Sequence, residues 1–191
     1  MKNLGNSLNQ VRHITFDSFI TDSERIAIES LINEAKMEDS TIYTTDKKAI
    51  SDSQIRKSRS RVLSRGENAI VDLITDRVLN LIYTPEEIGR VGVAIDLVKY
   101  KDKGFLKEHQ DPFMDGRKPN REFTAIIYIK SPNEGGKTVY PNLNLTIDPI
   151  ENRMFLFKNI YNGQIDDSSV HYGEKTIGEK AILVFFLNEI N

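Results

Sequence analysis

Short apolar segments separated by turn-forming residues fill the second half of the chain, and they constrain the fold more than any other feature. The segments are rich in β-branched and aliphatic residues, and Ser131-Pro132-Asn133 and Gly135-Gly136 are two of the turns between them. They span residues 91–100, 123–129, 137–140, 143–147, 154–157, 170–172 and 181–187. Short strands at this spacing favour an antiparallel sandwich or barrel, so we predict a mainly β fold for residues 91–188.

Two helices are predicted ahead of these strands. Thr21-Asp22-Ser23-Glu24 fits a capping box, in which the threonine and the glutamate bond the first free amides of a helix. Apolar residues then recur at helical spacing from residue 28 to 35, and again within residues 66–83. We expect both helices on the outer face of the strand region. Residues 1–90 would then be a helical N-terminal support for a core of residues 91–188, in a single domain of residues 1–191.

The composition excludes several classes of site. The 191 residues include no cysteine, so disulfides, thiolate nucleophiles and cysteine-based zinc or iron–sulfur centres are ruled out. A net charge of −2 carries no signature of nucleic-acid or anionic-membrane binding. The sequence shows neither an N-terminal apolar signal region nor a run of about 18 apolar residues. We therefore expect a cytoplasmic protein with neither a nucleic-acid nor a membrane partner.

Two of the three histidines are candidate metal ligands. His109 and Asp111 are two residues apart, so on an extended segment their side chains point to one face. His171, from a distant strand, would complete two imidazoles and one carboxylate, the donor set of non-haem Fe(II) facial triads. The H-x-D pair alone is weak evidence, because a strand at the surface can carry such residues without any metal. The strand-rich setting and a nearby lysine strengthen the metal hypothesis.

Lys180 follows His171 by nine residues and enters the last apolar segment. A buried ammonium without an anionic partner is costly, and a dicarboxylate cosubstrate would provide that partner. If Gly178-Glu179 forms a hairpin turn, His171 and Lys180 lie on adjacent strands and face the same interior. The alternative is a lysine that protects a strand edge. Tyr128, whose phenol could donate to the same carboxylate, and Tyr100 could instead be ordinary tyrosines at the edge of the core.

Arg56-Lys57-Ser58-Arg59-Ser60-Arg61, with Arg65 close behind, is a compact basic segment. It could hold an acidic or peptide substrate, or belong to a regulator that contacts peptide or nucleic acid, for which binding would be salt-dependent and independent of iron. A solvated loop is an equally good interpretation. Residues 38–54 and 112–120 are the candidate loops for closing over a site.

Six motifs, in order along the chain, resemble those of the prolyl 4-hydroxylase family of Fe(II)- and 2-oxoglutarate-dependent dioxygenases. The most specific is Gly135-Gly136-Lys137-Thr138-Val139-Tyr140-Pro141, which matches the family pattern G-G-x-T-x-[FY]-P. The others are Arg56-Lys57-Ser58, Val98-Lys99-Tyr100 followed by Gly104 and His109-Gln110-Asp111, Arg121 to Tyr128 as R-x-x-T-x-x-x-Y, Met154-Phe155-Leu156-Phe157-Lys158-Asn159, and His171-Tyr172-Gly173 followed by Gly178-Glu179-Lys180.

The resemblance implies a double-stranded β-helix core, of the jelly-roll or cupin-like kind, with the two N-terminal helices packed on its outer face. It also implies that His109, Asp111 and His171 bind iron. Because Asp111 supplies a carboxylate at the third protein position, the halogenases of the wider family, which bind a halide there, are disfavoured.

The cosubstrate and substrate contacts are likewise implied by the resemblance. Lys180 with Tyr128 would hold the distal carboxylate of 2-oxoglutarate, and Tyr100 is a further candidate for that pocket. Arg121 would face the substrate at the catalytic centre. Molecular oxygen is the implied second cosubstrate, and ascorbate is the implied reductant.

Three features depart from the family pattern. Leu106 stands three residues before the first metal histidine, where the family usually carries a tyrosine. No tryptophan follows Lys180, and Ala181 and Phe186 occupy the corresponding region. Asn152 replaces a turn glycine, although asparagine also tolerates a left-handed turn. The change at Leu106 falls in the substrate-facing region and leaves the expected iron and 2-oxoglutarate residues intact.

The leading functional hypothesis is hydroxylation of an unactivated C–H bond in a peptidyl proline, with release of succinate and carbon dioxide. A hydroxylase of a free amino acid or small metabolite is the nearest alternative. A non-catalytic jelly-roll binding module is a third, against which the complete candidate triad and Lys180 argue.

Overall fold

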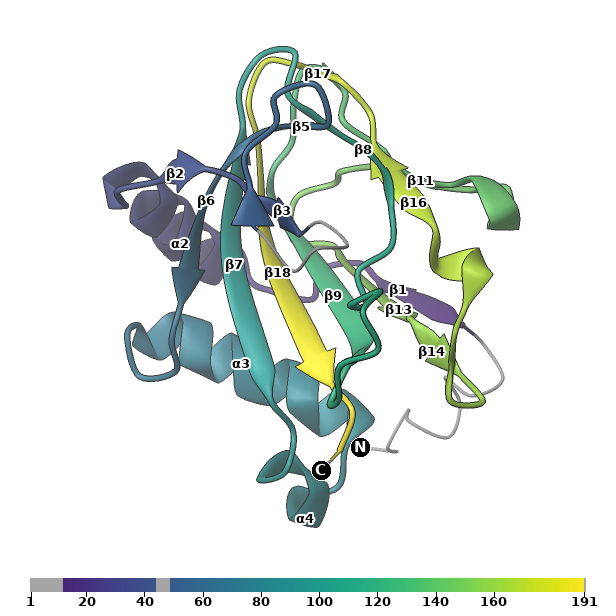
Figure 1. Cartoon of the computed structure of the whole chain (residues 1–191). Helices are drawn as coiled ribbons and strands as arrows, with labels where there is room; N and C mark the ends of the chain where they lie inside the picture. Colours follow the sequence, from purple (N-terminus) through teal and green to yellow (C-terminus); the bar gives the residue numbers. More distant parts are fainter. Residues whose placement is uncertain (1–11, 44–48, 191) are drawn as a thin grey trace.

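The computed structural model describes residues 12–43 and 49–190, and two large antiparallel sheets form their centre (Figure 1). The larger sheet has the order β1 (His13–Phe16), β13 (Met154–Lys158), β9 (Arg121–Lys130), β18 (Lys180–Asn188), β7 (Val93–Tyr100), β6 (Arg59–Leu63) and β2 (Glu38–Asp39). The smaller sheet has the order β12 (Leu145–Ile147), β11 (Thr138–Tyr140), β16 (His171–Gly173), β8 (Phe105–His109) and β5 (Arg56–Lys57). Short pairs are formed by β10 (Glu134–Gly135) with β17 (Thr176–Ile177), β14 (Ile160–Tyr161) with β15 (Gln164–Ile165), and β3 (Ile42–Tyr43) with β4 (Ala49–Ile50).

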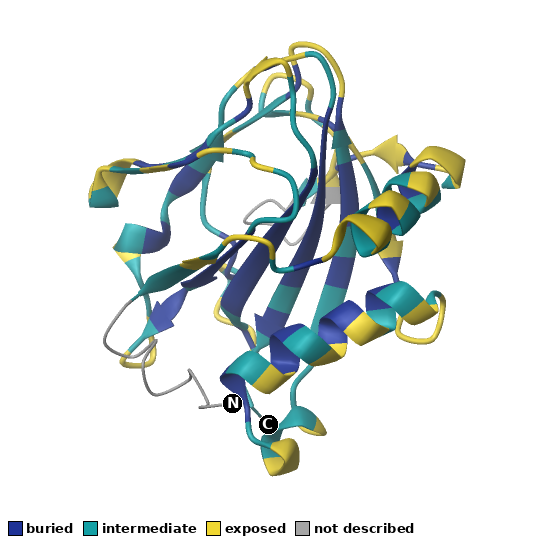
Figure 2. Cartoon of the chain, turned by 180° about the vertical axis from the view of Figure 1, so that it is seen from behind, coloured by how far each residue is buried: buried dark blue, intermediate teal, exposed yellow. Residues whose placement is uncertain are grey.

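Each face of the larger sheet has its own hydrophobic core, because successive side chains of a strand point to opposite faces. Along β18, Leu183, Phe185 and Leu187 belong to the core that the helices cover. Ile182 and Val184 belong to the second core, between the larger and the smaller sheet. Figure 2 shows the helices in front of the sheet, with buried strands behind them. This arrangement confirms the predicted double-stranded β-helix with helices on its outer face.

The helices are α2 (Asp22–Glu34), α3 (Ala69–Ile82) and the short α4 (Pro85–Ile88). The predicted capping box begins α2: Thr21 Oγ1 accepts from the Glu24 amide at 3.2 Å, and Glu24 Oε2 accepts from the Thr21 amide at 2.8 Å. The Asn68 side chain caps α3 and thereby sets its first residue at Ala69. Among the described residues, no helix is long and apolar enough to cross a membrane.

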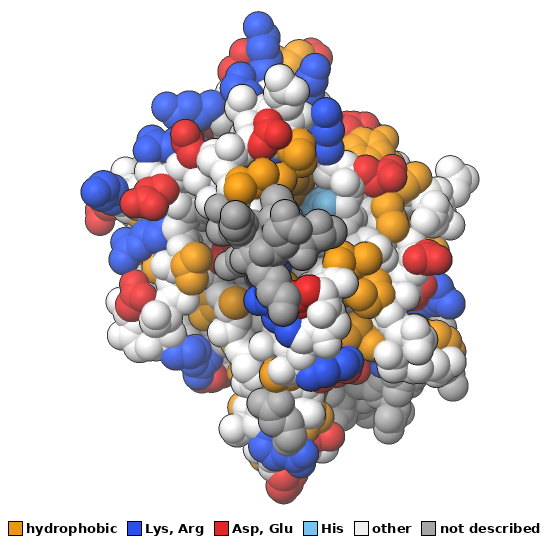
Figure 3. All heavy atoms as spheres, viewed as in Figure 1, with side chains coloured by type: hydrophobic (Ala, Val, Ile, Leu, Met, Phe, Trp, Pro, Cys, Tyr) orange, Lys and Arg blue, Asp and Glu red, His pale blue; other side chains and the backbone are white. Residues whose placement is uncertain are grey.

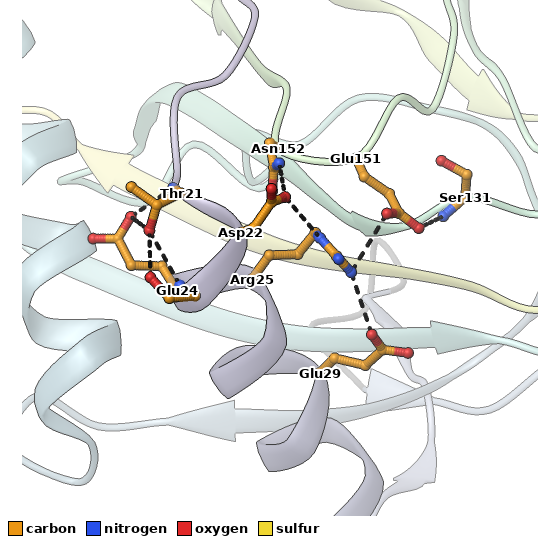
Figure 4. Close-up of polar contacts among 9 residues, drawn as sticks. Thr21, Asp22, Glu24, Arg25, Glu29, Ser131, Glu151 and Asn152 are labelled. Carbon is orange, nitrogen blue, oxygen red and sulfur yellow. Dashed lines mark hydrogen bonds and ion pairs between the residues drawn. The ribbon is translucent and has the colours of Figure 1, made fainter.

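Polar contacts fasten α2 to the turn that precedes β13 (Figure 4). The Asn152 side chain donates to Asp22 Oδ1 at 2.7 Å, and Arg25 lies 3.4 Å from carboxylate oxygens of Glu29 and Glu151. Asn152 has a φ of 68°, in the left-handed region that asparagine tolerates better than most residues. The asparagine therefore preserves the turn for which a glycine was expected, and it adds a contact to the helix that glycine would lack.

His171 and Lys180 lie in different sheets, so the prediction that they occupy adjacent strands is wrong. His171 begins β16 in the smaller sheet, whereas Lys180 begins β18 in the larger one. The connection between them contains β17, which pairs with β10 instead of forming one side of a tight hairpin. The expectation that both side chains face one interior still holds, because both line the same cavity between the sheets.

The basic segment is extended, which differs from the solvated loop considered above. Its first two residues form β5 at the edge of the smaller sheet, and residues 59–63 form β6 in the larger sheet. Arg61 lies 3.0 Å from Glu67, and Arg65 lies 2.6 Å from Asp76. Acidic neighbours therefore neutralise much of this segment, and it is not a continuous basic surface for an acidic partner.

Replacing Glu24 with glutamine should destabilise the protein, because the Glu24 carboxylate caps α2 and also pairs with Arg77 of α3. Arg77 Nη2 lies 2.6 Å from Glu24 Oε1, and this hydrogen bond lowers the pKa of the Glu24 carboxyl from 4.5 to about 2. We expect the free energy of unfolding at pH 7, measured by urea titration, to fall by about 1–2 kcal/mol.

The destabilisation by Glu24→Gln should depend on pH in a defined direction. A carboxyl whose pKa is lowered by folding stabilises the protein fully above its unfolded pKa and loses that effect as the pH falls through about 2. The difference from the wild type should therefore narrow between about pH 4.5 and about pH 2. Glu86→Ala, an exposed first-turn change in α4, is the control and should cost less than about 0.5 kcal/mol. An undiminished Glu24→Gln effect at pH 2 would contradict the ion-pair explanation.

Candidate metal centre and active-site cavity

His109, Asp111 and His171 come together on the inner side of the smaller sheet. His109 ends β8, His171 begins β16, and the two residues are paired directly across these strands. Asp111 Oδ1 lies 3.5 Å from His109 Nε2, and Asp111 Oδ2 lies 3.9 Å from His171 Nε2. One possible ligand atom from each residue lies within 4.8 Å of the other two. A single metal ion suits this set of donors and would keep further coordination positions open.

The hydrogen bonds of both imidazoles leave Nε2 available to a metal. His109 Nδ1 lies 2.9 Å from the Lys107 carbonyl oxygen, and His171 Nδ1 lies 2.8 Å from the Ser169 carbonyl oxygen. Because a carbonyl oxygen can only accept, each Nδ1 carries the proton and each Nε2 presents its lone pair to the centre. The backbone therefore selects the tautomer that a metal site of this kind requires.

The protonation states in the triad also suit a cation. Burial, together with repulsion from His109, lowers the pKa of His171 to about 4, so this imidazole is neutral at neutral pH. Burial alone would raise the pKa of Asp111, but the neighbouring imidazoles and Arg121 together hold it well below its usual range. A neutral imidazole and an ionised carboxylate are the forms that bind metals.

Thr124 and Asn159 form a chain of hydrogen bonds that ends at the Asp111 carboxylate. The Thr124 hydroxyl, on β9, donates to Asp111 Oδ2 at 2.8 Å, and Asn159 Nδ2 donates to the Thr124 hydroxyl oxygen at 2.9 Å. All three residues are buried. Asn159 stood out only as the last residue of the motif that begins at Met154, and Thr124 only as the threonine of the R-x-x-T motif, so neither role was predicted. These two residues fix the orientation of the carboxylate that would meet the metal.

Lys180 places a buried ammonium in the same interior. Lys180 is 3% exposed, and its Nζ donates to the Gly136 carbonyl oxygen at 2.6 Å. No carboxylate among the described residues lies within 4 Å of this Nζ. Burial lowers the pKa of Lys180 to about 8. An ammonium with unused donors in such a place favours an anionic ligand.

The predicted tyrosines surround this ammonium. Lys180 Nζ lies 5.2 Å from the Tyr100 ring centre and 5.5 Å from the Tyr128 ring centre. The Tyr128 hydroxyl bonds Thr138 Oγ1 at 2.8 Å, a partner that was not predicted. Gly136 packs closely against the lysine side chain. It has a φ of 67°, and a Cβ at this position would lie 3.2 Å from Lys180 Cδ. Two residues of the G-G-x-T motif, Gly136 and Thr138, thus shape the surroundings of Lys180.

A cavity of about 470 Å³ between the sheets contains both groups. The metal triad, Lys180 and Tyr100 all line it. Residues from both predicted closing segments, 38–54 and 112–120, also line it, and Met114 of the second segment is 63% exposed. Figure 3 shows a histidine side chain at the surface, with hydrophobic side chains nearby. The His109 side chain is 28% exposed, so the triad is accessible from the cavity.

Arg121 and Leu106 line the cavity that also contains the triad. Arg121 Nη1 donates to the Asp111 carbonyl oxygen at 3.2 Å, and its guanidinium carbon lies 3.8 Å from the Phe186 ring centre. Within the described segment 56–65, Arg56 is the basic residue that lines this cavity. Ser60 of the same segment also lines the cavity, whereas its other basic residues do not.

Replacing Thr124 with valine should weaken metal binding, because valine keeps the volume and leaves Asp111 Oδ2 without this donor. Loss of an outer hydrogen bond to a metal ligand typically lowers metal affinity about 10–100-fold. We expect a decrease of that order in oxygen-free calorimetric titrations with Fe(II). Thr75→Val removes a buried hydroxyl from α3 and should leave the affinity unchanged. Equal affinities of the two variants would refute the role of Thr124.

Comparisons with known proteins agree with this geometry. The family model described as the 2OG-Fe(II) oxygenase superfamily matches residues 95–188. Probable prolyl 4-hydroxylase 8 of Arabidopsis thaliana is 28% identical over 134 residues, which cover 68% of this chain and 45% of that protein. The chain therefore spans less than half the length of this curated relative.

Solved structures share the fold. The viral collagen prolyl hydroxylase vCPH from Paramecium Bursaria Chlorella virus-1, in its 2OG complex, matches with a TM-score of 0.75 at 20% identity, over 94% of this chain and 97% of that one. A prolyl hydroxylase from Trichoplax adhaerens, in complex with a hypoxia inducible factor oxygen degradation domain peptide fragment, matches with a TM-score of 0.69 at 18% identity, over 97% and 87% of the two chains. Residues 95–188 of the chain thus match the 2OG-Fe(II) oxygenase superfamily, and the chain is similar in sequence and fold to prolyl 4-hydroxylases.

Proposed function

We propose that the chain is a single-domain Fe(II)- and 2-oxoglutarate-dependent dioxygenase that hydroxylates an unactivated C–H bond of a prolyl residue in a peptide or protein. The observation that carries the proposal is one cavity in which a group of two histidines and one aspartate lies with a buried lysine. A metal, a dicarboxylate and a substrate carbon must meet in a space poor in water, and the interior between the two sheets is such a space.

His109, Asp111 and His171 are the proposed iron ligands. Their Nε2 and carboxylate oxygen atoms lie close together and would hold the iron, and three protein donors would keep coordination positions for other ligands. Bound iron supplies the redox chemistry by which 2-oxoglutarate and O₂ become succinate and carbon dioxide while the substrate gains a hydroxyl group. The chain's own task is to hold these ligands in fixed orientations, through the Lys107 and Ser169 carbonyls and the Thr124 hydroxyl.

Lys180 is the proposed partner of the distal carboxylate of 2-oxoglutarate. Its ammonium would form a charge-assisted hydrogen bond in a site that excludes water, which both anchors and orients the cosubstrate. The linked hydroxyls of Tyr128 and Thr138 are nearby donors for the same carboxylate, and the Tyr100 ring forms one wall. Ascorbate is the proposed reductant that keeps the iron in its ferrous state.

Arg121 is the proposed contact of the catalytic centre with the substrate, because it is stacked on Phe186 beside the triad and lines the cavity. The naming of the relatives as prolyl 4-hydroxylases supports a prolyl residue as the substrate, and the exposed Met114 at the cavity supports access by a chain longer than one residue.

A free amino acid or small metabolite is the second candidate substrate. The observation that favours it is Leu106, which lines the cavity where relatives are expected to carry a tyrosine.

Succinate release should increase when a proline-containing peptide is added to the protein with Fe(II), 2-oxoglutarate and ascorbate. His171→Ala should abolish this release, because two ligands do not retain the metal. His13→Ala, which alters the histidine of β1 outside the cavity, is the matched control and should keep it. Stimulation by free L-proline and none by the peptide would contradict the peptidyl assignment in favour of a small substrate. Absence of succinate from a protein that binds both metal and 2-oxoglutarate would support a non-catalytic module.

The affinity for 2-oxoglutarate should fall as the pH rises through about 8, because that is where the buried Lys180 ammonium loses its proton. With a pKa of about 8, the charged fraction of Lys180 decreases about tenfold between pH 7 and pH 9, and the affinity should decrease with it. Calorimetric titration of 2-oxoglutarate into the metal-loaded protein measures this dependence.

Two variants separate Lys180 from other titrating groups. Lys180→Met should bind 2-oxoglutarate weakly at every pH, and its affinity should not vary between pH 7 and pH 9. Lys137→Gln changes a half-exposed lysine that pairs with Asp148, and it should retain the wild-type profile. A pH profile for Lys180→Met that is parallel to the wild-type profile would assign the titration to another group.

A further inference from the structure

Asp96 is a carboxylate in an otherwise apolar row of side chains that faces the cavity. On β7 it is paired with Val62 of β6 on one side and with Val184 of β18 on the other. Val184 is in turn paired with Ile126 of β9, and all four residues line the cavity. Figure 1 shows these strands side by side in the larger sheet. A carboxylate at this place has no role in packing the core, since its neighbours across the sheet are aliphatic.

The Asp96 carboxylate has no hydrogen-bond or ion-pair partner within 4 Å among the described residues, although it is half-buried. Burial raises its pKa, and the more distant charges of Arg56 and Arg121 oppose that rise. Both arginines have other partners: Arg56 Nε donates to Ser58 Oγ at 2.9 Å, and Arg121 Nη1 donates to the Asp111 carbonyl oxygen at 3.2 Å. A carboxylate in this environment is stabilised by a donor that enters the cavity from outside.

The register of the sheet locates Asp96 relative to the reacting groups. Thr124, which bonds the metal ligand Asp111, is paired with Phe186 in the next row of the sheet. Lys180 and Tyr100 form a row farther along, at the proposed cosubstrate end. Along the strands, Asp96 therefore lies between these two rows. Across the sheet, β7 is two strands away from β9, which is a distance of roughly 10 Å. Its neighbour Val62 is 67% exposed, so this side of the cavity opens to solvent.

We propose that Asp96 is a specificity-determining residue that binds a cationic nitrogen of the substrate, an ammonium or a guanidinium, near the carbon that is hydroxylated. The inference rests on the proposed hydroxylase function, and it narrows the substrate class. Val62 and Val184 provide apolar surface for the aliphatic stem of a lysine or arginine side chain, whose charged end reaches Asp96. The cation comes either from a basic residue beside the target proline or from a free basic amino acid.

Equilibrium binding tests this inference independently of turnover. The protein is loaded with 2-oxoglutarate and Ni(II), which supports no oxidation, and titrated with three capped fluorescent peptides that carry lysine, norleucine or glutamate next to one proline. We expect the wild type to bind the lysine peptide at least about tenfold more tightly than the norleucine peptide, as a charge-assisted hydrogen bond allows. Asp96→Asn should remove this preference and leave the norleucine peptide within about twofold of wild type. Free L-lysine and L-norleucine, added as competitors, distinguish the two sources of the cation.

Two control measurements test whether the effect is specific to the Asp96 carboxylate. Asp96→Asn should bind Fe(II) and 2-oxoglutarate as the wild type does, which shows an intact centre. Asp148→Asn removes an exposed carboxylate that pairs with Lys137, and it should keep the preference for lysine. Asp96→Lys should reverse the preference in favour of the glutamate peptide.

The inference is overturned if neither the lysine peptide nor free L-lysine binds better than its norleucine counterpart. It is also overturned if Asp96→Asn weakens all three peptides equally, because Asp96 would then only balance the charges of Arg56 and Arg121. A preference for lysine that depends on Asp96, found without any succinate release, would support the Asp96 site and refute the proposed hydroxylase function. The two ideas therefore fail in distinguishable ways.

Discussion

Burial of the larger sheet on both faces is the constraint on which the rest of the structure depends. β9 and β18 lie near its centre, and most residues of both strands are buried. One face packs against α2 and α3, and the other faces the smaller sheet. A polar side chain on these strands has little access to bulk water, so it must find its partner inside the protein.

The polar residues of the inner face are consequently the informative ones. Thr124 meets the carboxylate of Asp111, and Lys180 meets a backbone carbonyl while keeping donors unused. Asp96 faces the same cavity without a close partner among the described residues. Each interrupts a row of aliphatic or aromatic neighbours in the larger sheet, so packing of the core does not explain why a polar residue stands there. A shared cavity for metal, dicarboxylate and substrate would explain all three positions.

Local signals predicted α2, α3 and most strands from residue 91 onward, but they missed β5 and β6 and did not indicate which strands are neighbours. The capping box at Thr21 and the strand segments from residue 91 onward are found where the sequence indicated, because capping and alternation depend on residues close together along the chain. The order β13–β9–β18–β7 joins strands that are far apart in sequence, and no local pattern specifies it. The error over His171 and Lys180 arose from this: a short connection suggested a hairpin, whereas the chain crosses from one sheet to the other.

The sequence by itself determined which residues are candidates for the centre. His109, Asp111, His171 and Lys180 stand out through donor chemistry and spacing, which are properties of residue type and local geometry. Only the tertiary structure decided how those candidates are supported: Asn159 reaches Thr124 across 35 residues of sequence, and Asp96 faces the cavity through its pairing with Val184. The physical reason is register. Successive side chains of a strand point to opposite faces, so the face and the neighbours of each polar residue depend on pairings between distant segments.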